Sequence, residues 1–166
     1  MAALFGLRGE RWLRHANPLS VWTRFGCLSL LAAAVWSRVW LGWWSTALIA
    51  AAVIWLMINP VLFPQPRSTR NWASKDVFGE RVWSERARLD IPSEFHSPVP
   101  NIANAYATMG VILLTYGLIR LQLFPMVTGI IIAHGGKAWY LDRMVLLFEA
   151  VKRRHSDYAD LEYERR

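Results

Sequence analysis

Four ionisable side chains stand close together near the end of the last long apolar run of the sequence. His134 and Lys137 are three residues apart, and Asp142 and Arg143 follow shortly after. Residues three apart share one face of a helix, so His134 and Lys137 would point the same way. A charged side chain costs ~2.5–3.5 kcal/mol at the centre of a membrane helix, which makes such residues candidates for function. Two interpretations stay open: a functional site, or a structural network in which Lys137 reaches the membrane surface and His134 bonds to a backbone carbonyl.

A second polar region lies in the middle of the sequence. Residues 67–75 carry basic side chains that could recognise an anionic group, and residues 76–89 have the spacing of a short surface helix, which Gly79 weakens. The alternative is an interfacial helix whose charges pair with one another and with lipid phosphates. If this region folds over the apolar runs, both polar regions meet in one cluster. That cluster could bind a lipid headgroup or another amphipathic anion, or it could close on itself as a lid. The candidate cluster comprises Arg67, Arg70, Lys75, Glu80, Arg81, His134, Lys137, Asp142 and Arg143.

Most familiar kinds of site are not indicated. There is no His-Glu-x-x-His motif, no pair of cysteines and no acidic calcium loop, so no metal site is predicted. No catalytic residue can be named, and the question of an enzyme stays open, with the sequence leaning against one. No cofactor is predicted either, except that His134 could be one axial ligand of a haem or a chlorophyll-type pigment.

Four apolar runs dominate the sequence and must position these residues. They cover residues 22–39, 44–63, 102–119 and 124–140, and each is long enough to cross a bilayer as a helix. The loops inside the two pairs are too short for anything but hairpins. We therefore predict an all-α membrane protein with four transmembrane helices in two hairpins and with interfacial amphipathic helices. Its segments are an N-terminal interfacial segment (1–20), a first hairpin (21–63), a loop with an amphipathic helix (64–101), a second hairpin (102–148) and a charged tail (149–166).

The distribution of charge predicts the orientation. If the N-terminus, the 64–101 loop and the tail share one side, that side holds every acidic residue and all but two of the 19 Lys and Arg residues. The exceptions, Arg38 and Arg120, lie at the hairpin tips. Because Lys and Arg favour the cytoplasmic side, both termini are predicted in the cytoplasm and the protein in the cell (inner) membrane. The net charge of +7 thus fits an anionic inner leaflet, and no nucleic-acid partner is expected. The tail from residue 155 onward is predicted to be solvated or a docking segment.

Aromatic and small residues indicate what the helices contact. The sequence has ten tryptophans, several of them at the first hairpin tip, where an aromatic belt would lie at headgroup depth. Small residues recur four apart and would let helices approach closely in lipid, either inside the protein or against a partner. These pairs are Ser29 and Ala33, Ala47 and Ala51, Ala103 and Ala107, and Gly129 and Ala133.

Several strings of residues resemble a family of small Trp-rich prokaryotic integral membrane proteins of unknown function. They include HANPLSVWTR (15–24), WSRVWLGWW (36–44), PRST (66–69), NWASK (71–75), GERVW (79–83) and LDRM (141–144). The resemblance extends over roughly residues 15–153. It implies a multi-span membrane protein, and no residue role comes with it.

Three functions remain in competition. The favoured one is a non-catalytic accessory or scaffold subunit of a membrane complex, with the lipid bilayer and a membrane-protein partner or a second copy as its contacts. The alternative is a small membrane enzyme or binder of an anionic lipid-like ligand at the cytoplasmic face. The third is a pigment- or haem-binding subunit that uses His134.

Overall fold

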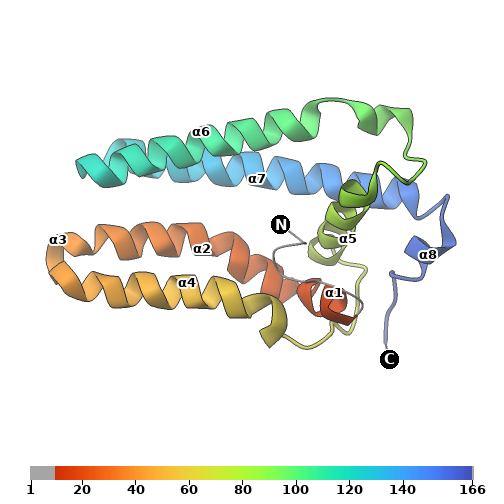
Figure 1. The fold of residues 1–166 in the computed structure, drawn as a ribbon, viewed down its shortest axis with the longest axis horizontal. Helices are drawn as coiled ribbons and strands as arrows, with labels where there is room; N and C mark the ends of the chain where they lie inside the picture. The colour runs from red at the N-terminus through yellow and green to blue at the C-terminus, as the bar shows by residue number, and fades with distance from the viewer. Residues whose placement is uncertain (1–9, 166) are drawn as a thin grey trace. The chain divides into compact units, whose positions relative to one another are not determined.

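The chain folds into helices. A computed structural model describes residues 10–165, and within this range the only pairing of extended backbone is an isolated antiparallel bridge between Ser68 and Glu164. The all-α prediction is confirmed. The helices are α1 (Glu10–His15), α2 (Pro18–Trp36), α3 (Arg38–Leu41), η2 (Gly42–Trp44), α4 (Ser45–Leu62), α5 (Trp72–Glu85), η3 (Ser93–His96), α6 (Val99–Arg120), α7 (Leu123–Val151) and α8 (Ser156–Ala159), as Figure 1 shows.

Two compact units make up the structure. Unit 1 contains residues 10–22, 60–100 and 140–165, and unit 2 contains residues 23–59 and 101–139. The long helix α7 contributes to both units. The first nine residues of the predicted N-terminal interfacial segment lie outside the described range.

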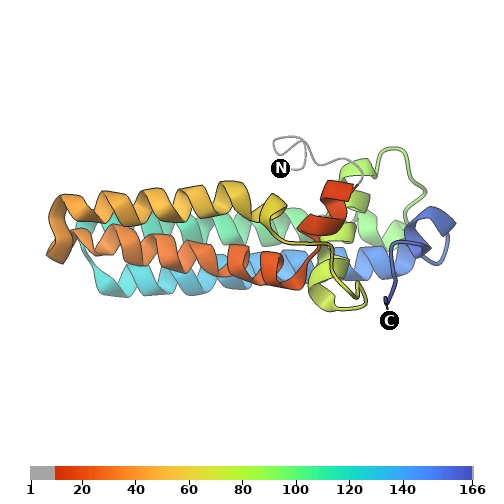
Figure 2. The same ribbon diagram turned by 90° about the horizontal axis from the view of Figure 1, so that it is seen from below.

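Unit 2 consists of two helical hairpins. The first joins α2 to α4 through the short helices α3 and η2, and the second joins α6 directly to α7 (Figures 1 and 2). Gly42 begins η2 with a φ of 52°, a backbone conformation that glycine adopts at little cost. In the second hairpin a similar turn is made by Leu121, also at a φ of 52°, where the Cβ atom makes the conformation strained.

Both hairpin tips lie at the same end of unit 2. A guanidinium N–H of Arg38, at the first tip, donates to the carbonyl of Leu118, next to the second tip. Away from the tips, Asn59 Nδ2 donates to Thr23 Oγ1 over 2.8 Å and joins the two open ends of the first hairpin. The chain therefore leaves unit 2 from the end opposite the tips.

Glycines set the distance between α6 and α7. A Cβ atom on Gly136 would lie 2.5 Å from the backbone nitrogen of Ala107, and one on Gly129 would lie 2.3 Å from that of Leu114. Two of the four predicted small-residue pairs, 103/107 and 129/133, thus serve packing inside the protein. On the first hairpin, by contrast, Ala33, Ala47 and Ala51 are exposed.

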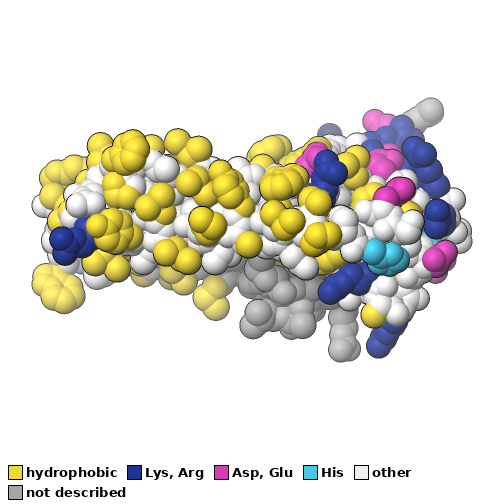
Figure 3. Space-filling view, turned by 90° about the horizontal axis from the view of Figure 1, so that it is seen from above, with side chains coloured by type: hydrophobic (Ala, Val, Ile, Leu, Met, Phe, Trp, Pro, Cys, Tyr) yellow, Lys and Arg dark blue, Asp and Glu magenta, His cyan; other side chains and the backbone are white. Residues whose placement is uncertain are grey.

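The surface of unit 2 is largely apolar. Its exposed side chains include Trp40, Trp43, Trp44, Met57, Ile112, Ile119, Phe124 and Ile131. Hydrophobic side chains cover the visible face of its helices in Figure 3, with basic side-chain atoms at the hairpin-tip end. Two segments, Pro18–Leu62 and Ser93–Arg120, are long and apolar enough to cross a membrane by length and composition; the first includes both α2 and α4. The number of spans stays a prediction.

Unit 1 is organised around α5 and the second half of α7. Phe78 and Phe148 are fully buried, with ring centroids 5.3 Å apart. Asn71 caps the start of α5, its Oδ1 atom accepting from Ser74 N over 2.9 Å. The helix begins four residues before the predicted surface helix and buries half of its residues, including Gly79.

Candidate functional site

The predicted polar residues fall in both units. His134 and Lys137 belong to unit 2, and the other members of the candidate cluster belong to unit 1. The single cluster that would join the two polar regions stays a prediction.

Two lysines and two glutamates form the central charged cluster of unit 1. Lys75 Nζ lies 2.5 Å from Glu149 Oε1 and 3.5 Å from Glu162 Oε1, and Lys152 Nζ lies 2.7 Å from Glu149 Oε2 and also contacts Glu162. All four side chains are between 18% and 27% exposed, so they are partly screened from solvent. The cluster connects α5, α7 and the tail. Only Lys75 was among the predicted residues, although the spacing of Glu149 and Lys152 is that of a helical ion pair.

The cluster shifts the pKa values of its members. Burial tends to raise the pKa of Glu149, but hydrogen bonds to Lys152 and Lys75 and their charges outweigh it and lower the pKa. The hydrogen bond from Lys152 likewise lowers the pKa of Glu162. Burial tends to lower the pKa of Lys152, but its bonds to the two glutamates raise it overall. The cluster therefore favours the charged forms of both glutamates and of Lys152.

We expect these pKa shifts to make stability depend on pH at both extremes. The carboxylates contribute stability above about pH 4.3, their ordinary pKa, and this is lost as the pH falls through their lowered values. Lys152 contributes below about pH 10.4, and this is lost as the pH rises through its raised pKa. Thermal unfolding in mild detergent should report an effect on the order of 1 kcal/mol. A Glu149→Gln/Glu162→Gln variant should flatten the acid limb, and an unchanged limb would contradict the assignment.

The C-terminal tail is docked onto the segment before α5. Thr69 is fully buried; its Oγ1 donates to the Leu161 carbonyl over 2.7 Å and accepts from Tyr163 N over 2.8 Å. Arg165 N donates to the Arg67 carbonyl over 2.8 Å, so Arg67 takes part through its backbone. Of the two interpretations of the tail, the structure supports docking.

Two further predicted residues form ion pairs on the surface of unit 1. Arg70 pairs with Glu164 over 3.0 Å, with both side chains more than half exposed, a geometry that contributes little stability. Arg81 Nε lies 3.2 Å from Glu85 Oε1 on the same helix. The Tyr158 hydroxyl donates to Glu85 over 2.6 Å; burial and this bond raise the pKa of Tyr158. Arg81 is therefore part of a contact between α5 and α8.

His134 is held by backbone carbonyls in unit 2. Its Nδ1 lies 2.9 Å from the Ile130 carbonyl and its Nε2 lies 3.1 Å from the Phe25 carbonyl. Carbonyls only accept, and a neutral imidazole has one N–H, so a neutral ring satisfies one of the two contacts. Such a bond to a backbone carbonyl is what the structural interpretation of His134 predicts. An axial bond to a haem or pigment would need one nitrogen released, and that role stays a prediction. Within residues 10–165, no three His, Cys, Asp or Glu side chains are placed to hold a metal ion.

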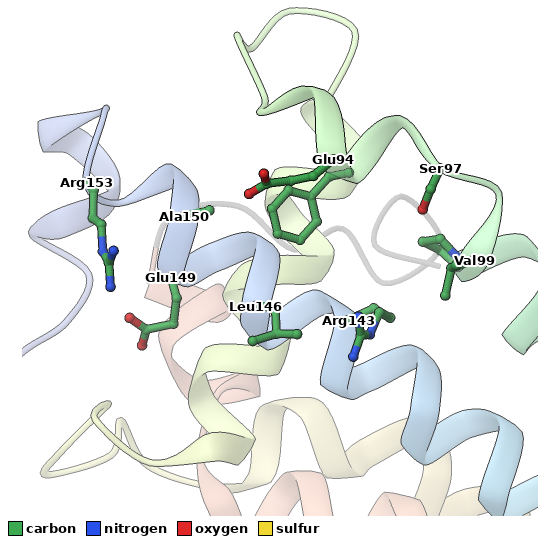
Figure 4. Close-up of a pocket in the computed structure, with 10 residues that line it drawn as sticks. Glu94, Ser97, Val99, Arg143, Leu146, Glu149, Ala150 and Arg153 are labelled. Atoms are coloured by element: carbon green, nitrogen blue, oxygen red, sulfur yellow. The ribbon is translucent and has the colours of Figure 1, made fainter.

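An open groove of about 430 Å³ lies between the η3 region and the second half of α7 (Figure 4). It is lined by Glu94, Phe95, Ser97, Val99, Pro100, Arg143, Leu146, Glu149, Ala150 and Arg153. A second, more open cavity of about 440 Å³ is lined by Arg70, Lys152, Arg153, Ala159 and Glu162. Of the predicted residues, Arg143 lines the first cavity and Arg70 the second. Glu94 and Arg153 were missed, because nothing local in the sequence brings residue 94 to residue 153.

Comparison with known proteins gives a family but no activity. One family model matches the chain, over residues 1–161, and its description is a family of unknown function (DUF6653). No curated protein and no solved structure matches the chain.

Proposed function

The chain belongs to this family of unknown function, and since membership assigns no activity, we propose that the protein is a multi-pass membrane protein that serves as a non-catalytic accessory or scaffold subunit of a membrane complex. The match agrees with the predicted resemblance to a family of unknown function; that the family consists of Trp-rich prokaryotic membrane proteins stays a proposal. We propose four spans, formed by α2, α4, α6 and the first part of α7.

The observation that carries the proposal is the exposed apolar surface of unit 2. In the most apolar stretch of Pro18–Leu62, only 17% is buried within the protein, whereas the core helix of a soluble protein would be mostly buried. Contiguous apolar surface of this kind is unfavourable in water and fits a lipid or protein environment. Lipid contact around α2, α4, α6 and α7 would remove this cost.

The ends of unit 2 support the proposed orientation. The hairpin tips carry Arg38 and Arg120 and no acidic residue. Of the other charged residues, only Arg24 and Lys137 belong to unit 2, and the chain connections at the end opposite the tips lead into the segments that carry the rest. An excess of Lys and Arg on one side favours the cytoplasm for that side. We therefore place the tips outside the cytoplasm and both termini inside it, in the inner membrane.

The proposed role as a subunit of a complex rests on exposed aromatic side chains at the hairpin tips and on exposed small residues of the first hairpin. Trp40, Trp43 and Trp44 are 74%, 89% and 79% exposed, and Phe124 at the second tip is 83% exposed. Aromatic side chains at this level anchor a helix at the headgroups and are also frequent at protein interfaces. The exposed small residues of α4 would let a neighbouring membrane helix approach. The occupant is a second membrane protein or a second copy of this chain.

Membrane topology can be tested with two single-cysteine variants. In a Cys27→Ser background, Gln122→Cys places a thiol at the exposed second tip and Ser156→Cys places one at an exposed tail position. A membrane-impermeant maleimide should label Gln122→Cys in intact cells and Ser156→Cys only after lysis. The protein should also stay in membranes washed with alkaline carbonate. Release by carbonate would refute the membrane assignment, and labelling of Ser156→Cys in intact cells would refute the orientation.

The subunit role needs a separate measurement. After extraction in mild detergent, native mass spectrometry should show the chain bound to a second membrane protein or to a further copy of itself. A monomer recovered under conditions that keep other complexes intact would contradict the role and leave the topology standing.

A further inference from the structure

The groove between the η3 region and α7 combines an apolar floor with basic side chains. Phe95 and Val99 line one side and Leu146 the other. Arg143 of α7 and Arg153 of the turn that follows α7 lie at opposite ends of the groove (Figure 4). In Figure 4, Arg143 lies toward Val99, and Glu94 extends over the turn of α7 that carries Ala150. An apolar surface between charged groups suits an amphipathic ligand better than a small inorganic ion.

Apart from Glu149, the charged side chains that line the groove are two arginines and one glutamate. Glu149 lines the groove, but Lys75 and Lys152 already neutralise it at 2.5 and 2.7 Å. Within residues 10–165, Glu94 and Arg153 make no ion pair. The lining therefore has two guanidiniums and one carboxylate that no lysine neutralises. A ligand with one net negative charge would balance these three lining side chains, since Asp142, the neighbour of Arg143, is not part of the lining.

Arg143 has bonding capacity left for such a ligand. Its Nη2 atom lies 3.4 Å from Asp142 Oδ2, too long for a good charge-assisted hydrogen bond, and both side chains are substantially exposed. Its Nε atom is buried and finds no hydrogen-bond acceptor among the described residues. A guanidinium with N–H groups unused in this way is suited to a phosphate, which can accept several of them.

The groove lies next to the proposed membrane spans along the chain. Pro100, in its lining, directly precedes the part of α6 that belongs to unit 2. Arg143 follows Trp139, the last residue of unit 2, by four residues, about one turn of helix. If those helices cross the bilayer as proposed above, residues one turn beyond their ends lie at the depth of lipid phosphates.

We propose that this groove binds the headgroup of a membrane phospholipid that carries one net negative charge. The phosphate lies against Arg143, the apolar part of the lipid contacts Val99 and Leu146, and Arg153 attracts the negative charge. Glu94 accepts hydrogen bonds from headgroup hydroxyls and disfavours more strongly anionic ligands. Membrane access to the groove rests on the proposed function, but its binding chemistry does not.

Water-soluble short-chain lipids test the groove independently of membrane insertion. We would titrate the full chain in non-ionic detergent with dihexanoylphosphatidylglycerol and dihexanoylphosphatidylcholine. The anionic lipid should bind about tenfold more tightly, and Arg143→Gln or Arg153→Gln should each weaken its binding about tenfold. Glu94→Gln should strengthen binding. The matched control is Arg154→Gln, which removes the same charge from a neighbouring residue that faces Asp90 outside the groove; it should change affinity less than about twofold.

Three results would overturn the proposal: equal binding of the two lipids, unchanged affinity in both arginine variants, or displacement of the lipid by inorganic phosphate at matched concentration. The last would mean a small-anion site. Helical circular dichroism and the unfolding midpoint are measured for each variant, and exposed Arg153 provides the test if Arg143→Gln does not fold. If the protein stays in carbonate-washed membranes but does not bind the lipid, only the groove proposal is refuted. If carbonate releases the protein, the proposed function is refuted.

Discussion

Gly79→Ala is expected to lower the free energy of unfolding by about 2–4 kcal/mol, the largest effect among the substitutions considered. A Cβ atom on Gly79 would lie 1.9 Å from the Met144 carbonyl oxygen and 2.4 Å from its carbon. These are backbone atoms of α7, so no rotamer change can make room and α5 must move away. Thermal unfolding in detergent and hydrogen exchange of the α5 amides would measure the change.

Gly135→Ala is the matched control for this experiment. Gly135 also lies inside a helix, but a Cβ atom there would meet nothing within 4 Å. Alanine has the higher helix propensity, so this variant should be unchanged or more stable by about 0.5–1 kcal/mol. If both variants behaved alike, the close approach of α5 and α7 would not be a determinant of stability.

Thr69→Val is expected to release the C-terminal tail at a cost of about 1–3 kcal/mol. Valine has nearly the same shape as threonine but removes the hydroxyl that bonds both the Leu161 carbonyl and Tyr163 N. Both groups would lose this partner beside a fully buried side chain. Hydrogen exchange should become faster at the amides of Thr69, Tyr163 and Arg165, which are bonded across the tail contact.

Thr115→Val provides the comparison for the tail. Thr115 is exposed in α6, and its hydroxyl donates to the Val111 carbonyl of its own helix. Loss of that bond leaves the helical backbone intact, so tail exchange and stability should stay within about 0.5 kcal/mol of the native protein. Unchanged tail exchange in Thr69→Val would show that the other contacts of the tail hold it without the hydroxyl.

The sequence by itself determined the helices and the two hairpins. Apolar runs of this length favour helices, and loops of a few residues leave the joined helices no arrangement but antiparallel, so local information suffices. The predicted runs 44–63 and 102–119 agree with α4 (Ser45–Leu62) and α6 (Val99–Arg120) within a few residues. The continuation of the fourth run into a longer helix, α7, was also predictable from helical spacing.

The sites depend on contacts between residues far apart in the chain. Only the tertiary structure determines these contacts. By helix propensity alone, Gly79 weakens its helix. The structure shows why a glycine is needed there: the backbone of Met144 leaves no room for a Cβ atom. The anion-binding role of Arg67 and Arg70 stays a prediction, but the sequence could not show that the Arg67 carbonyl accepts from Arg165 N or that Arg70 pairs with Glu164. Pairings over such separations depend on how helices dock and not on local spacing. For the same reason, the sequence could offer Arg143 as a candidate but could not bring it into one groove with Glu94 and Arg153.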